Sequence, residues 1–357
     1  MATQDATAGV PIAVQPERDM QRVRLLELPA DLLALVTSEN PPRLYIKSKH
    51  VPPGGNAKEA HSVLCTPDKT YQIRQVSTSN SVYLIQPHDS PDPHPALAGG
   101  LPRVGVEAVA KCDTSIELLP TPATSAAPYI QAALPTYAST GNYGRADGGG
   151  CATKRELFSH IPLSDAECEA GWRQLACFES TDPPGCFIPS AKVKAEVWQS
   201  AMMAAVADGF DVCAPFPEND IPAYAIDLPG DWPRDIVIGV FAGVSSSTPG
   251  GHLAVDEQKA VRFAGANLLQ AKSEGRAIEA TTFRKAWRDA MPEAWRSKCE
   301  FATLQGYYSL DDNAKSIRYL DTAADAKAAA DSSAKEAKSL GAKRKWHEKF
   351  KASKKTA

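Results

Sequence analysis

Cysteine and histidine are the residues of this sequence that could perform nucleophilic catalysis. His50 and His61 precede Cys65 in the chain. A cysteine nucleophile needs an imidazole in contact with its thiol, because the thiolate is the reactive form. Spacing along the chain does not establish such a contact, and a small buried thiol is the more ordinary interpretation. We therefore expect no catalytic residue, and no enzyme activity in this chain.

Three further cysteines raise the question of a metal site. Cys168, Cys177 and Cys186 follow one another at intervals of nine residues. Structural zinc sites usually pair their ligands two to four residues apart, and this sequence has no such cysteine pair. We expect no metal, and the eight scattered cysteines indicate reduced thiols inside the cell.

Nucleotide hydrolysis would require a phosphate-binding loop. The sequence has no glycine-rich loop that ends in Lys-Ser or Lys-Thr, and the run Gly148–Gly150 is followed by Cys151. We interpret this run as part of a linker. The sequence therefore predicts no cofactor and no ATP hydrolysis.

The charge of the chain is unevenly distributed. Residues 322–357 hold ten Lys/Arg and four Asp/Glu, a balance of +6, so the remainder carries −3 − 6 = −9. A basic cluster of this kind can direct nuclear import or contact nucleic-acid phosphates, and the alternative is a solvated tail. The candidate residues for import or DNA binding are Lys343, Arg344, Lys345, Lys349, Lys351, Lys354 and Lys355.

Strand patterns dominate the first third of the chain. Residues 1–20 are predicted to be a disordered arm, and 21–119 a small antiparallel β-barrel or sandwich built from short apolar segments between turns. No run approaches the ~18 apolar residues of a membrane span. The predicted strands are Arg22–Leu28, Leu44–Lys47, Ser62–Cys65, Tyr71–Val76, Val82–Gln86 and Val104–Lys111.

Helical patterns dominate after a predicted linker over 120–150, so the fold class is α+β. Ser164 and Glu167 form a capping-box pattern, and Ser190 is placed to begin a second helix that Gly209 ends. These signals, with a short strand between them, predict a winged-helix-like domain over 151–232.

The residues 233–322 give a clearer pattern of the same class. Helices are predicted over Asp256–Lys272 and Thr281–Ala290, with a third helix from Pro292 that carries Trp295, Cys299 and Ala302. A hairpin follows, with strands Tyr307–Leu310 and Ile317–Leu320. Three helices and a two-stranded wing indicate a winged-helix domain. Residues 323–357 are an Ala/Lys-rich tail.

One sequence block resembles a known family. The run from Val63 to Arg74, which contains Leu-Cys-Thr-Pro-Asp-Lys-Thr-Tyr, together with Thr78–Ser81, is similar to the signature of the defective-in-sister-chromatid-cohesion family. Residues in two later segments, 157–175 and 253–306, resemble winged-helix segments of the same family and occur in the same order along the chain. Family members usually continue into a further Trp- and Leu-rich winged helix, whereas this chain has its Ala/Lys tail.

The resemblance implies a non-catalytic scaffold subunit of the alternative replication factor C clamp loader in the nucleus. Its implied partners are a small cohesion subunit, the large ATPase subunit, the replication factor C small subunits, the sliding clamp PCNA, DNA polymerase epsilon and DNA. The N-terminal strands would join the first two in a composite barrel. The implied partner-binding residues are Val63, Leu64, Tyr71, Ile73, Val82 and Leu84.

The competing hypothesis is a winged-helix transcription regulator or another DNA-binding adaptor. Such a regulator would need a strongly basic recognition helix. The candidate helix instead balances Arg296 and Lys298 against Glu293 and Glu300. This balance favours the scaffold hypothesis.

Overall fold

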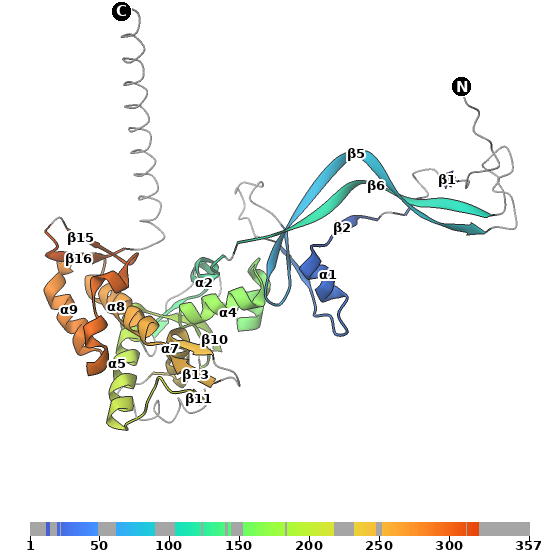
Figure 1. Ribbon diagram of the computed structural model, residues 1–357. Coiled ribbons are helices and arrows are strands. Elements are labelled where there is room, and N and C mark those ends of the chain that lie inside the picture. The colour runs from blue at the N-terminus through green and yellow to red at the C-terminus, as the bar shows by residue number, and fades with distance from the viewer. Residues whose placement is uncertain are drawn as a thin grey trace, which may run out of the picture. The chain divides into compact units, whose positions relative to one another are not determined.

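The structure is a computed structural model, and its residues fall into two compact units. The first lies within 1–126 and 155–170, and the second within 127–154 and 171–357. The fold is mixed α+β with several small sheets (Figure 1). The residues described are 12–14, 20–21, 23–48, 62–89, 104–122, 124–139, 142–143, 153–182, 184–217, 232–247, 252–311 and 313–320.

The first unit is built on a six-stranded sheet in the order β1-β6-β5-β4-β3, with β2 also paired to β6. Strands β3 to β6 are antiparallel, whereas β1 and β2 lie parallel to β6. The strands are β1 Ile12–Val14, β2 Leu25–Glu27, β3 Tyr45–Ser48, β4 Ser62–Cys65, β5 Thr70–Asp89 and β6 Val104–Pro120.

The part of the chain that the structure describes has no closed barrel, which was one form of the predicted barrel or sandwich. The sheet stays open, because β3 forms one edge while β1 and β2 line the other side of β6. The predicted strands Tyr71–Val76 and Val82–Gln86 are one continuous strand, β5, and Val104–Lys111 extends to Pro120. Two long paired strands therefore replace several short ones, and they form a ribbon visible in Figure 1.

A register shift divides this ribbon into two halves. The pairs Ser77↔Thr114 and Val82↔Cys112 leave four residues of β5 opposite one residue of β6. A bulge of this kind bends a strand and increases its twist. We call residues 70–77 with 114–120 the proximal ribbon, and residues 82–89 with 104–112 the distal ribbon.

Helices of the first unit pack against the proximal ribbon and its neighbouring strands. Helix α1 (Ala30–Val36) contributes Leu32 to a core that contains Leu64, Tyr71 and Leu118. The first unit also includes Arg155–Ala170, which holds most of α3 (Lys154–His160) and the start of α4 (Asp165–Gln174). The predicted capping box is confirmed at the start of α4, where Ser164 Oγ accepts from Glu167 N at 3.3 Å and Glu167 accepts from Ser164 N at 3.1 Å.

The second unit contains three small sheets, with strand orders β8-β7-β10-β9, β11-β13-β12 and β14-β16-β15. Its helices and short 3-10 turns are α2 Ala127–Ala133, α5 Ala191–Ala207, α7 Arg234–Val244, α8 Glu257–Ser273, α9 Ala280–Asp289, η4 Glu293–Lys298 and η5 Phe301–Leu304. Its strands are β7 Thr136–Ser139, β8 Asn142–Tyr143, β9 Phe178–Thr181, β10 Pro184–Pro189, β11 Phe216–Pro217, β12 Ser245–Ser247, β13 His252–Val255, β14 Ile278–Glu279, β15 Tyr308–Leu310 and β16 Ser316–Tyr319.

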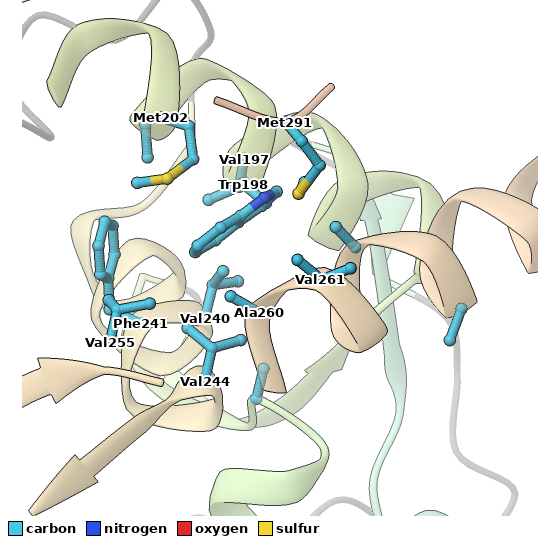
Figure 2. Close-up of a cluster of buried hydrophobic side chains, with 14 of the residues drawn as sticks. Val197, Trp198, Met202, Val240, Phe241, Val244, Val255, Ala260, Val261 and Met291 are labelled. Atoms are coloured by element: carbon cyan, nitrogen blue, oxygen red, sulfur yellow. The ribbon is translucent and has the colours of Figure 1, made fainter. Parts of the chain in front are cut away.

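One continuous hydrophobic core holds the second unit together. Figure 2 shows Trp198 of α5 between Val240 and Val244 of α7 and Val261 of α8. The Trp198 side chain is fully buried and its ring centroid lies 6.0 Å from that of Phe241. A core with this many buried apolar side chains can stabilise the unit without a metal or disulfide.

Several local predictions for this unit are confirmed. Helix α8 begins after Asp256, whose side chain accepts from Lys259 N, and α9 and the β15–β16 hairpin lie where the periodicity indicated. Ser190 caps α5 through Val193 N. The predicted third helix is wrong in form, because Pro292–Leu304 folds as the two 3-10 turns η4 and η5.

The predicted linker, arm and tail are described to different extents. In the described part of the predicted linker 120–150, the structure has α2 and β7, anchored by the buried residues Ile130 and Tyr137. The predicted arm contains β1, and the tail 323–357 lies outside the described residues. Among the residues searched, no helix has the length and apolar character needed to span a membrane.

Candidate partner-binding surface

The distal ribbon presents four consecutive apolar side chains to solvent. Val82, Tyr83, Leu84 and Ile85 of β5 are 47%, 46%, 38% and 54% exposed. Soluble proteins rarely expose contiguous apolar surface of this kind unless it binds a partner. We call these four residues the exposed β5 cluster.

The cluster faces both sides of the ribbon. Side chains alternate along a strand, so Val82 and Leu84 lie on one face while Tyr83 and Ile85 lie on the other. The β6 side of the distal ribbon is covered, since Ala108 and Ala110 are 1% and 0% exposed, whereas the β5 side presents apolar side chains to solvent. A partner that covers both faces would remove this apolar surface from water, at about 25 cal/mol per Å².

Within the described residues, the β5 backbone also has an edge without a strand partner beside the cluster. Strand β4 pairs with Thr70–Gln72 of β5, and no described strand pairs with residues 82–85 on the side away from β6. The opposite side of β6 is occupied by β1 and β2, and Gln21 N donates to Val109 O between them. Unpaired strand edges accept strands from other chains, so a partner strand can add along β5.

The sequence block that carries the family resemblance has an architectural role in the structure. Thr66 closes the β4–β5 turn, since its hydroxyl accepts from Lys69 N at 2.8 Å and donates to Asp68 at 2.8 Å. Tyr71 Oη and Lys69 Nζ both donate to Asp31 of α1, at 2.8 and 2.9 Å. The block therefore fixes α1 against the proximal ribbon.

Asp31 is the electrostatic centre of this contact. The hydrogen bonds from Lys69 and then Tyr71 lower the pKa of Asp31 to about 2. Burial, followed by the contact with Asp31, raises the pKa of Tyr71 to about 12. Asp31 is therefore a carboxylate and Tyr71 a neutral donor throughout the physiological range.

The structure places the predicted partner-binding residues in two different environments. Val63, Leu64 and Tyr71 are 2%, 7% and 2% exposed and belong to the interior of the first unit. Ile73 packs against the same core as a partly buried residue. Val82 and Leu84 are exposed on the distal ribbon.

Sequence reasoning missed Tyr83 and Ile85, although a signal for them was present. A strand with one face in water alternates apolar and polar residues, whereas residues 82–85 are all apolar. A continuous apolar run indicates a strand that is covered on both faces. The candidate tail residues Lys343, Arg344, Lys345, Lys349, Lys351, Lys354 and Lys355 lie outside the described residues.

The cysteines in the described ranges are buried as packed thiols are, except Cys213, which is exposed. Cys65 is buried, and burial raises its pKa, which is the opposite of what an activated nucleophile needs. Burial also raises the pKa of Cys168 and of Cys177 to about 12. Within the described residues, no group of three or more Cys, His, Asp or Glu side chains is placed to hold a metal ion.

Comparisons with known proteins identify the family. The search of curated proteins gave no match. The family model for sister chromatid cohesion protein Dcc1 matches residues 23–324, which is most of the chain and includes both units. The chain therefore belongs to the sister chromatid cohesion protein Dcc1 family, and this membership implies a role in sister chromatid cohesion.

Proposed function

We propose that this chain is a non-catalytic scaffold subunit of the alternative replication factor C clamp loader. In this role it joins the small cohesion subunit and the large ATPase subunit to the replication factor C small subunits. The assembly loads or unloads PCNA in the nucleus and contacts DNA polymerase epsilon and DNA. ATP hydrolysis belongs to other subunits, in keeping with the lack of a phosphate-binding loop in this sequence.

The exposed β5 cluster is the observation that carries the proposal. It combines apolar side chains on both faces of a ribbon with a β5 edge that has no strand partner among the described residues. A partner strand that adds to β5 supplies backbone hydrogen bonds, and its side chains cover one or both faces. This arrangement suits an obligate subunit contact, because such interfaces are more apolar than transient ones.

The second unit supports the adaptor part of the proposal. The order α8, β14, α9, η4, η5, β15, β16, with a sheet ordered β14-β16-β15, supports the proposal of a winged-helix domain over 233–322 through its two helices and its β15–β16 hairpin. Winged helices bind proteins as well as DNA. We propose that this unit faces DNA or the polymerase, and that the basic tail adds phosphate contacts or directs import.

Native co-purification of the tagged full-length chain, followed by mass spectrometry, tests the proposal. The expected result is recovery of the small cohesion subunit, the large ATPase subunit and the replication factor C small subunits in comparable amounts. Recovery of the cohesion machinery without any clamp-loader subunit would overturn the scaffold assignment. A tagged chain that is expressed and soluble but recovers no partner would overturn it as well.

A further inference from the structure

Residues Arg155–Ala170 belong to the N-terminal unit although they follow the predicted linker by several positions. This segment contributes four side chains that are almost completely buried: Leu157, Ile161, Leu163 and Cys168 are 1%, 3%, 5% and 0% exposed. A segment that buries this much apolar surface is part of the core of its unit. The segment therefore completes the N-terminal fold from a distant place in the chain.

A buried lysine on the sheet binds this segment. The Lys47 side chain on β3 is only 8% exposed. Its Nζ donates to the backbone carbonyls of Phe158 at 3.0 Å and Leu163 at 2.7 Å, and lies 3.5 Å from the Asp165 carboxylate. An ammonium group buried at this depth needs such acceptors, because an unpaired buried charge is strongly unfavourable.

A second set of bonds holds the start of α4 to the β4–β5 turn. Thr70 Oγ1 donates to Glu167 Oε2 at 2.5 Å and accepts from Ser164 N at 2.8 Å. Pro67 O accepts from Ala166 N at 2.9 Å. Thr70 therefore extends the Ser164–Glu167 capping box across to the sheet, so that the same bonds cap α4 and hold it to the turn.

The strand register shows which face of the sheet is involved. Lys47 pairs with Val63, and Cys65 pairs with Thr70, so Lys47, Val63, Cys65 and Thr70 share one face of the sheet. Leu64 and Tyr71 lie on the opposite face, in the core with Leu32 of α1. The burial of Val63 and Cys65, at 2% and 1% exposure, is explained if the segment covers their face.

We propose that Arg155–Ala170 acts as an intramolecular strap that closes one face of the N-terminal sheet, with Lys47 and Thr70 as the positioning residues that lock it. The strap and α1 thus lie on opposite faces of β4 and the start of β5. The proposal does not depend on the identity of the partner, since it concerns the chain alone.

Cysteine reactivity provides a residue-resolved test in the full-length chain. Cys65 of the sheet and Cys168 of the strap are buried at this contact, and burial raises the pKa of both thiols. Cys177, Cys186 and Cys299 are buried in the second unit, and Cys213 is exposed. Iodoacetamide labelling followed by mass spectrometry measures the alkylation rate of each thiol separately.

The variants Lys47→Met and Thr70→Val remove the locking bonds and preserve side-chain bulk. Each should raise the alkylation rates of Cys65 and Cys168 together, by about tenfold or more, since local opening makes protected groups accessible. Cys177, Cys186 and Cys299 should keep their wild-type rates. The matched control is Lys192→Met on α5, which removes a lysine that is 74% exposed and should change none of these rates.

Two results would overturn the strap. Wild-type rates at Cys65 and Cys168 in both variants would show that Lys47 and Thr70 do not lock the segment. Rapid labelling of Cys65 and Cys168 in the wild-type chain, at a rate close to that of Cys213, would show that the face is open without any substitution. If Lys47→Met unfolds the whole chain, all thiols react together, and Thr70→Val then decides between these outcomes.

Discussion

Replacing Trp287 of α9 with alanine should destabilise the second unit. The Trp287 side chain is completely buried, and its ring stacks on Phe283 with centroids 5.9 Å apart. Its indole Nε1 donates to Val261 O of α8 at 3.1 Å. A Cβ atom added at Gly265 would lie 2.5 Å from the Trp287 ring, so α8 and the ring are in direct contact.

The expected magnitude follows from these contacts. Truncation of a fully buried tryptophan costs about 3–5 kcal/mol through lost burial and the cavity left behind. For a unit of this size, each kcal/mol lowers the melting temperature by about 2–4 °C, so the melt should shift by roughly 6–20 °C. Trp287→Phe keeps most of the apolar contact but loses the hydrogen bond, and should cost less.

A double-mutant cycle with Gly265 sharpens the assay, which is denaturant unfolding of the full-length chain. Gly265→Ala alone should be destabilising because its methyl group meets the Trp287 ring, and this penalty should largely disappear in the Trp287→Ala background. Met203→Ala is the control, since Met203 is 67% exposed and should change stability by less than about 0.5 kcal/mol. An unchanged melt for Trp287→Ala, or additive effects in the cycle, would refute the packing.

Three further predictions concern charge and chemistry. The pKa of Asp31 is lowered from 3.8 to about 2, so the carboxylate's contribution to stability is present above pH 3.8 and is lost as the pH falls through 2. The melting temperature should therefore fall between pH 5 and pH 2. The Asp31→Asn variant should show a smaller fall over the same pH range. Removing residues 342–357 should weaken the salt dependence of DNA binding, because each phosphate contact contributes about 0.9 to the slope of log affinity against log salt concentration. An unchanged slope would show that the tail does not bind DNA phosphates. The purified chain should neither bind nor hydrolyse ATP in a titration, and turnover would contradict the scaffold assignment.

Local signals in the sequence predicted the structure best. The capping box at Ser164, the Asp256–Lys272 helix and the terminal hairpin all depend on neighbouring residues, and all are present. The Ser62–Cys65 strand was predicted with its observed bounds. Short-range hydrogen bonds and periodicity are visible in a sequence because the residues that determine them are adjacent.

The features that were missed depend on distant residues. A small barrel or sandwich was predicted from six short strands, but the architecture depends on which edges meet, and here β1 and β2 line the outer side of β6. The contacts of Lys47 with Phe158 and Leu163 could not be predicted from local patterns, because the bonded residues lie more than a hundred positions apart in the chain. The predicted third helix is interrupted at Cys299, which leaves helical geometry between the 3-10 turns η4 and η5.

The candidate partner-binding residues were also predicted only in part. Val82 and Leu84 were identified as strand residues, and the structure places them in the exposed β5 cluster. Val63 and Tyr71 were also predicted to bind a partner, but they are interior residues. Strand periodicity does not show that α1 and Arg155–Ala170 of the same chain cover them. A strand pattern therefore indicates which residues could pack, but not whether the cover comes from the same chain.

The most direct test of the central claim is quantitative recovery of clamp-loader subunits with a ribbon variant. The double variant Val82→Asp/Leu84→Asp places two charges on exposed positions of β5, and should leave the stability of the chain nearly unchanged. The matched control, Met203→Asp/Val206→Asp, adds the same charges at exposed apolar positions of α5. Our account predicts that the ribbon variant loses the small cohesion subunit and the large ATPase subunit while the control retains both. Undiminished recovery with a folded ribbon variant would contradict it.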